Sequence, residues 1–333
     1  MSISHFFEKK RWIFGLALGF FTIALPLCVF AEGPTGTVWV ADESSDSVTV
    51  IDAATNKVAK TITGIMGPHN VQVAPDGKTV WATSGHENEV VVIDAKSYKE
   101  LGRIPVGKMP AHIVLTPNGA MAYVSNEDGG TVTAIDTATM KVIITIPVGS
   151  GPHGLRVSPN GKEVYVADSK STTLSVIDVA TNKKAADIEV GRKPVQVGFS
   201  PDGKYVYFSL NGENAAGKVD VATRKVVGKV NVGRGPVQVF VTPDNRYVLV
   251  ANQGTEKDPA DTVSMIETAT FTVAATVKTG KGSHGVAINS SGTFAYITNT
   301  FADTVSVIDI MKRNIAATVK VGKEPNGISV SPF

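Results

Sequence analysis

A glycine recurs along this chain at an almost constant spacing, and this period constrains the fold more than any other feature. Successive copies lie 42 or 43 residues apart, except for one gap of 47. Each glycine closes a segment with the same order of apolar, turn and charged residues. The glycines are Gly64, Gly107, Gly149, Gly191, Gly233, Gly280 and Gly322. A repeat of this length is typical of a β-propeller blade.

Each repeat predicts four short strands. In the copy that begins at Pro152, PHGLRV, EVYVAD, TLSVID and KKAADIEV alternate with a period of two and are rich in β-branched and aromatic residues. Ser-Pro-Asn-Gly and ATNK supply turns between them. No stretch after residue 31 has a helical period, so the sequence predicts an all-β fold. One strand is expected to be weak, because Gly217 and Lys218 replace the usual strand residues.

The number of repeats predicts how the ring closes. Complete units begin near Pro68, Pro110, Pro152, Pro194, Pro236 and Ser283. The residues before Gly64 supply only a second, third and fourth strand, and the C-terminal PNGISVSPF supplies only a first strand. We therefore predict a seven-bladed β-propeller of four-stranded antiparallel blades over residues 32–333. Its last blade is closed by the N-terminal strands plus the C-terminal strand.

The first 31 residues have the pattern of a signal peptide. Lys9, Lys10 and Arg11 precede an apolar run that ends near Val29, and Ala31 supplies the small residue before the expected cut. An uncleaved membrane anchor is the alternative, which Pro26 and the cleavage site disfavour. We expect a secreted or periplasmic protein with no membrane span after cleavage.

Composition excludes several kinds of chemistry. Cys28 is the one cysteine and lies in the leader, so the mature chain has no thiol for a disulfide, a metal or a nucleophile. The chain carries 32 basic and 30 acidic residues, which gives no general attraction to nucleic acid. We expect a monomer.

Several segments resemble a known repeat family. VYVAD, YVSN and AYITN, followed by TVSVID and an ATxKV turn, are similar to the YVTN-family propeller repeat. Residues 34–333 as a whole resemble the periplasmic YncE-like seven-bladed propellers. The resemblance implies the fold. It does not fix the function, because this fold hosts binding proteins, haem domains, lyases and lactonases.

Four histidines are assigned to one position of the repeat, at the start of the first strand. They are His69, His112, His153 and His284, and in the other repeats the position holds Val195, Val237 and Asn326. First strands line the channel of a propeller, so these imidazoles are expected to converge at its mouth, where they can bind a transition metal or a cofactor. His86 lies in a loop and is expected to be an ordinary surface residue.

Two methionines favour copper at this mouth. Met66 and Met109 each stand three residues before a histidine, in entry loops counted as one residue longer than the others. Thioether and imidazole together suit copper, with zinc or haem as weaker candidates. The alternative is structural. The histidines then bond Asp42, Asn126, Asp168 or Asn299 of a neighbouring blade, and the methionines fill a gap in the channel lining.

A basic rim is predicted on the same face. The residue after the repeat glycine is basic in five copies, and with Asn326 these residues form a candidate ligand or partner rim. The basic residues are Lys108, Arg192, Arg234, Lys281 and Lys323. Such a rim attracts anions, although solvated loop charges beside Gly and Pro are the favoured explanation, because no aromatic residues for stacking lie there.

The sequence favours binding over catalysis. No Ser-His-Asp order, Walker loop or dinucleotide fingerprint has the required context. A lactonase or lyase needs channel carboxylates, and the histidine position holds none. We therefore predict a periplasmic binding protein that holds copper, with an unidentified protein or small ligand at the channel mouth. The alternatives are a haem- or metal-dependent enzyme or biosynthesis factor that uses the same face, and an interaction scaffold with structural histidines.

Overall fold

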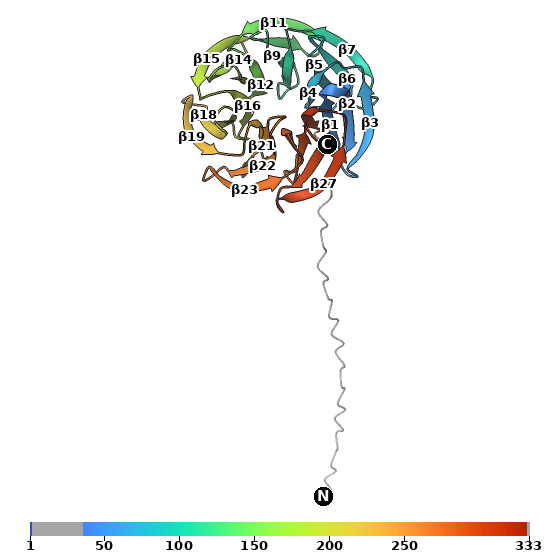
Figure 1. Ribbon diagram of the computed structural model, residues 1–333, viewed down its shortest axis with the longest axis vertical. Coiled ribbons are helices and arrows are strands. Elements are labelled where there is room, and N and C mark those ends of the chain that lie inside the picture. Colours follow the sequence, from blue (N-terminus) through green and yellow to red (C-terminus); the bar gives the residue numbers. More distant parts are fainter. Residues whose placement is uncertain (2–35, 332–333) are drawn as a thin grey trace. The chain divides into compact units, whose positions relative to one another are not determined.

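Seven four-stranded antiparallel sheets form the part of the chain that the structure, a computed structural model, describes. This part comprises Met1 and residues 36–331. Figure 1 shows the sheets arranged as blades around a common centre, as the repeat predicts. The predicted signal peptide over residues 1–31 lies outside the described residues, apart from Met1. Within the described ranges, no helix is long and apolar enough to cross a membrane.

The first strand of each blade faces the centre of the ring. Each of these strands contacts the first strand of the next blade, so together they line the central channel. They are β4 (Pro68–Val73), β8 (Pro110–Leu115), β12 (Pro152–Val157), β16 (Pro194–Phe199), β20 (Pro236–Val241), β24 (Ser283–Ile288) and β28 (Pro325–Val330).

The second and third strands form the middle of each blade and are almost fully buried. The second strands are β1 (Thr37–Asp42), β5 (Thr79–Ser84), β9 (Met121–Asn126), β13 (Glu163–Asp168), β17 (Tyr205–Leu210), β21 (Tyr247–Gly254) and β25 (Phe294–Asn299). The third strands are β2 (Ser47–Asp52), β6 (Glu89–Asp94), β10 (Thr131–Asp136), β14 (Thr173–Asp178), β18 (Ala215–Asp220), β22 (Pro259–Glu267) and β26 (Thr304–Asp309). One 3-10 turn, η1 (Glu43–Ser45), follows β1.

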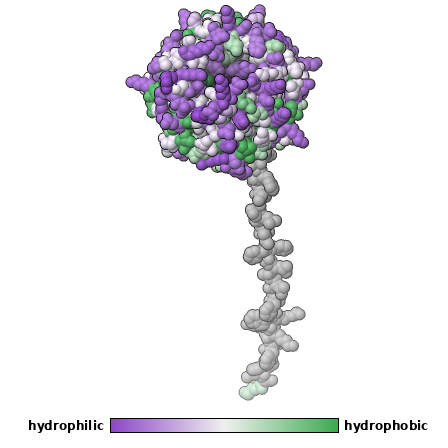
Figure 2. Space-filling view, viewed as in Figure 1, coloured by the Kyte–Doolittle hydropathy of each residue, from purple (hydrophilic) through white to green (hydrophobic). Residues whose placement is uncertain are grey.

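The fourth strands form the outer edge, where Figure 1 shows them at the periphery. They are β3 (Lys57–Thr63), β7 (Glu100–Pro105), β11 (Lys141–Pro147), β15 (Lys183–Glu189), β19 (Lys225–Asn231), β23 (Thr272–Lys278) and β27 (Asn314–Lys320). Hydrophilic residues cover most of the face seen in Figure 2, and hydrophobic residues form small separate patches.

The ring closes as the repeat count predicts. The C-terminal strand β28 pairs antiparallel with β1 in one sheet, which has the order β28-β1-β2-β3. The backbone N–H of Ser331 extends this pairing by donating to the carbonyl of Thr37 at 2.8 Å. The closing blade therefore joins residues from both ends of the described chain and leaves no open sheet edge between first and last blades.

The core lies between neighbouring blades. A large side chain at the third position of the second strand is buried in every blade, and the apolar clusters combine residues of adjacent sheets. These side chains are Trp39, Trp81, Tyr123, Tyr165, Tyr207, Leu249 and Tyr296. Packing of this kind makes each blade depend on its two neighbours.

The expectation of a weak third strand at Gly217 and Lys218 is wrong. Strand β18 is six residues long and pairs on both sides. The ring of Phe208 occupies the space that a side chain at Gly217 would need, and the Lys218 ammonium lies 4.8 Å from the Tyr205 ring centre. Tertiary packing thus outweighs the low strand propensity of glycine.

Candidate functional site

The first strands bring one residue per blade to the channel mouth, directly after the strand's first residue. In every described blade the first and second strands shift register just after this point, so the backbone here is irregular. The mouth residues are His69, Ala111, His153, Val195, Val237, His284 and Asn326.

His112 does not occupy this position, which corrects the sequence assignment. Pro110 pairs with Asn126 as Pro68 pairs with Ser84, so Ala111 is the counterpart of His69. His112 donates its backbone N–H to Ser125 Oγ at 3.0 Å, and Asn70 makes the same bond to a second-strand hydroxyl. The strand-starting proline, and not the histidine, marks the register. Only the loop from Gly64 to Pro68 is therefore longer than the others.

His69, His112 and His153 nevertheless converge. One ring nitrogen of each lies within 4.8 Å of the other two. The Nε2 atoms of His69 and His153 are 3.2 Å apart, and the ring centres of His112 and His153 are 4.7 Å apart. We call these three residues the histidine triad. Two of its imidazoles come from the mouth position, and the third comes from one residue deeper in the channel.

The His112 imidazole has no hydrogen-bond partner among the described residues. Its side chain is fully buried, and neither Nδ1 nor Nε2 is paired. A buried polar group without a partner costs on the order of 1–3 kcal/mol. His153 differs, because its Nδ1 lies 3.2 Å from the carbonyl oxygen of Val195. A carbonyl only accepts, so this contact places the proton on Nδ1 and leaves the Nε2 lone pair directed toward His69.

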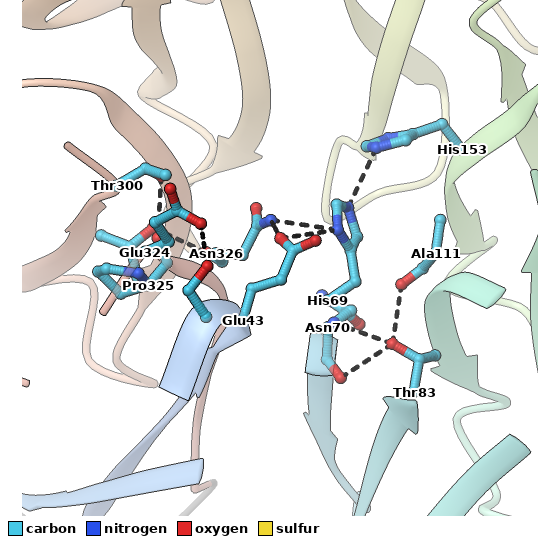
Figure 3. A network of polar contacts seen from close by, with 12 residues as sticks. Glu43, His69, Asn70, Thr83, Ala111, His153, Thr300, Glu324, Pro325 and Asn326 are labelled. Atoms are coloured by element: carbon cyan, nitrogen blue, oxygen red, sulfur yellow. Dashed lines mark hydrogen bonds and ion pairs between the residues drawn. The ribbon is translucent and has the colours of Figure 1, made fainter. Parts of the chain in front are cut away.

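Glu43 and Asn326 hold the far side of the His69 ring. The Nδ1 atom of His69 lies 3.4 Å from Glu43 Oε2 and 3.1 Å from Asn326 Nδ2, and Asn326 also donates to Glu43. Figure 3 shows His69 between this pair and His153. A carboxylate behind one imidazole nitrogen directs the other nitrogen toward a ligand, as in carboxylate–histidine–metal arrangements.

Burial keeps most of this cluster neutral. Desolvation, reinforced by the neighbouring imidazoles, lowers the pKa values of His112 and His153 well below the ordinary value and the pKa of His284 to about 3. Desolvation also opposes charge on His69, but Glu43 outweighs it, so the pKa of His69 is raised. Burial raises the pKa of Glu43, but the contacts with His69 and Asn326 together outweigh burial and bring that pKa to about 2. Neutral imidazoles have the free lone pairs that a metal requires.

Glu43 was missed by sequence reasoning, which looked for carboxylates only at the histidine position and found none there. A usable signal exists in the seventh residue counted from the start of each second strand. These residues are Glu43, Gly85, Glu127, Ser169, Asn211, Gln253 and Thr300, of which Gln253 still belongs to β21. Glu127 forms an ion pair with Lys170, while Glu43 points to His69.

The remaining predicted ligands, His284, Met66 and Met109, lie outside the histidine triad. The His284 ring centre is 6.2 Å from that of His69, and its buried Nδ1 has no partner among the described residues. Met66 and Met109 each expose 37% of their surface in the entry loops, so their role as ligands stays a prediction. His86 is exposed and lies against Gly67, as expected of a surface residue.

The predicted basic rim is exposed. Four of its five cations have no carboxylate within 4 Å among the described residues, while Arg234 pairs with Asp258. The four are Lys108, Arg192, Lys281 and Lys323. Their role as a ligand or partner rim stays a prediction.

The proposed structural partners of the histidines bond elsewhere. Asn126 donates to Thr131 and Thr133 of its own blade, and Asp168 accepts from Thr173 and Ser175. Asp42 and Asn299 make equivalent bonds. These side chains tie second strands to third strands and are not partners of the imidazoles. His69 is held instead by Glu43 and Asn326, and His153 by the carbonyl of Val195.

Comparisons with known proteins agree with the fold. A family model described as a lactonase seven-bladed β-propeller matches residues 40–226, and a YNCE-like β-propeller model matches residues 196–332. No curated protein matches the chain.

Solved structures include similar propellers. Kuenenia stuttgartiensis hydrazine synthase is 25% identical, with 81% of this chain and 91% of that chain covered and a TM-score of 0.73. A functionally unknown protein from Desulfotomaculum acetoxidans is 17% identical, with 89% and 99% covered and a TM-score of 0.79. Dihydro-haem d1 dehydrogenase NirN is 14% identical, with 91% and 77% covered and a TM-score of 0.67. The last two likenesses show the fold alone.

Proposed function

We propose that this chain, which belongs to the seven-bladed β-propeller family described by the lactonase model, is a periplasmic binding protein that holds one transition-metal ion at the histidine triad. One observation carries the proposal: His112 is fully buried, and within residues 36–331 neither of its ring nitrogens has a partner, beside two imidazoles whose nitrogens converge with its own. A metal ion satisfies such nitrogens, whereas an empty site leaves their desolvation uncompensated.

Copper is our first choice of ion. Imidazole sites bind Cu(II) more tightly than Zn(II), and the thioethers of Met66 and Met109 near the mouth suit Cu(I). Three imidazoles leave an open coordination position for water or a small ligand. The periplasmic location rests on the leader pattern of residues 1–31 and on the YncE-like character of the repeats.

Metal content after loading tests the proposal. The mature protein is incubated with Cu(II) or Zn(II), separated from free metal by gel filtration and analysed for metal and protein. We expect one equivalent in the wild type and in the surface variant His86→Ala, and none in the triple variant His69→Ala/His112→Ala/His153→Ala. Circular dichroism checks that the triple variant is folded. A metal-free wild type, or equal metal in the folded triple variant, contradicts the proposal.

A second candidate is a metal-dependent hydrolase that uses the same mouth. Glu43 and the match to the lactonase model favour it, since a carboxylate near a metal-bound water is a common hydrolytic pair. Hydrolysis of glucono-δ-lactone by the loaded protein, lost in both the triple variant and Glu43→Gln, supports this function. If the loaded protein binds metal but does not hydrolyse the lactone, the proposed function is that of a binding protein.

A further inference from the structure

The opposite end of the channel carries a second polar site that is separate from the histidine triad. The fifth residue of each first strand lies near this end, three positions beyond the mouth residue. These residues are Gln72, Val114, Arg156, Gly198, Phe240, Ala287 and Ser329. Two adjoining cavities of about 240 Å³ and 150 Å³ open here, and both are lined by Arg156, Val157 and Phe240.

Arg156 is a charged group without a counter-ion. Its guanidinium lies 5.8 Å from the ring centre of Phe240, and Nη1 donates to the carbonyl of Leu155 at 3.1 Å. No carboxylate lies within 4 Å of it in the described part of the chain. Arg103 and Arg224 differ from it, because each pairs with a glutamate. Burial lowers the pKa of Arg156 to about 10, which leaves it charged at neutral pH.

The surroundings of Arg156 suit an organic anion. Phe240, Val114 and Val157 supply apolar walls, and Gln72 lines the same cavity. The Gln72 amide donates to the Val73 carbonyl at 3.0 Å and lies 3.4 Å from Ser329 Oγ, so it is held in place without bonding Arg156. A partly buried cation without a partner is costly, and an anion that fills the cavity removes this cost.

We propose that this end of the channel binds the carboxylate group of a small organic acid. The guanidinium of Arg156 holds both carboxylate oxygens, because its planar fork matches that geometry. The apolar part of the acid lies against Phe240 and Val114. A monocarboxylate matches the single positive charge of the cavity, whereas a phosphate group carries about −1.5 to −2 charges at neutral pH. The inference does not depend on metal binding at the histidine triad.

Calorimetric titration with benzoate tests the site, with benzamide and inorganic phosphate as comparison ligands. The variants are Arg156→Met, which removes the charge, and Arg156→Lys, which keeps the charge but not the fork. Arg246→Met is the matched control. Arg246 also lies over an aromatic ring, 5.4 Å from the centre of Tyr247, but it is exposed and lines neither cavity.

We expect benzoate to bind the wild type and Arg246→Met equally, and to bind Arg156→Met at least tenfold more weakly, with Arg156→Lys between them. Benzamide should not bind the wild type, because it has the ring without the charge. Absence of benzoate binding to the wild type overturns the site, and so does equal binding by Arg156→Met. Phosphate binding as tight as benzoate binding overturns the choice of a carboxylate.

Discussion

Polar residues at equivalent positions on two sides of the ring differ in the hydrogen bonds that they make. On one side, Gln196 and Gln238 occupy the third position of their first strands. The side-chain oxygen of each accepts a bond from a backbone N–H, at 2.9 Å and 3.1 Å, whereas neither Nε2 has a partner among the described residues. On the other side, His112 occupies the same position and has no partner among the described residues. Each glutamine therefore satisfies one backbone N–H, that of Val197 in its own strand or that of Val286 in the next blade, whereas the described part of the fold uses neither ring nitrogen of His112.

The largest expected effect comes from making His112 resemble its counterparts. His112→Gln should weaken Cu(II) binding by about a thousandfold, because it removes one of three ligands from a buried site. The free energy of unfolding without metal should stay equal or rise, because an unpaired buried imidazole is removed. Competition titration with a copper chelator and urea unfolding measure the two quantities. Copper binding by His112→Gln as tight as in the wild type would show that His112 is not a ligand.

A substitution on the glutamine side of the ring tests the same comparison. Gln196→Leu should leave copper binding unchanged and lower the free energy of unfolding by about 1–3 kcal/mol, because the N–H of Val197 loses its buried acceptor. Urea unfolding of the metal-free protein checks this value. If Gln196→Leu instead weakened copper binding as strongly as His112→Gln does, the two sides would not differ as described.

Two glutamates at equivalent positions offer a matched pair. Glu43→Gln should weaken copper binding by about 10–100-fold, because the carboxylate orients His69 and increases its basicity. Glu127→Gln should have little effect, because Glu127 is engaged with Lys170. The same chelator competition measures both variants. Equal losses in the two would show a general effect of negative charge at the mouth instead of a specific contact.

The last residues of two second strands, Asn126 and Asp168, allow a comparison of how stability depends on pH. Asn126 donates to two hydroxyls, whereas Asp168 at the same position is fully buried and has an unpaired Oδ1. Desolvation raises the pKa of Asp168 to about 6, from 3.8. A raised pKa in the folded state means that this group favours folding below pH 4 and loses that contribution as pH rises to about 6.

Asp168→Asn should therefore raise the free energy of unfolding at pH 7.5 by about 1–2 kcal/mol and reduce its change between pH 4.5 and 7.5. Urea unfolding at the two pH values provides the measurement. The interpretation fails if the variant is less stable than the wild type at pH 7.5.

The smallest effect is expected at the methionines. Met66→Leu should weaken Cu(I) binding less than about tenfold and leave Cu(II) binding unchanged, because the side chain is partly exposed and only Cu(I) favours a thioether. Competition with a Cu(I)-specific chelator measures the change. A loss of Cu(II) binding as large as that of His112→Gln would make Met66 a principal ligand.

The fold was predictable because the sequence repeats with a regular period. Glycine spacing, turn prolines and two-residue alternation predicted the blades and the closure between β1 and β28, and the structure has both. The error at β18 arose from local propensity, because the space that Phe208 fills beside Gly217 is a tertiary feature.

The site was predictable only in part. Counting from glycine to histidine assigned His112 to the mouth position, whereas the proline that starts β8 sets the register. Convergence of the triad depends on irregular backbone after each proline, which no local pattern reveals. Glu43 was hidden because it belongs to η1 and not to a first strand, although its alignment with Glu127 offered a signal.

The most direct test of the central claim is electron paramagnetic resonance of the protein loaded with one equivalent of Cu(II). We expect nitrogen superhyperfine structure from three imidazoles in the wild type, from two in His112→Gln, and an unchanged spectrum in His86→Ala. A wild-type spectrum without imidazole nitrogens, or one that His112→Gln leaves unchanged, would contradict the claim that the unpaired nitrogens of His112 serve a metal ion.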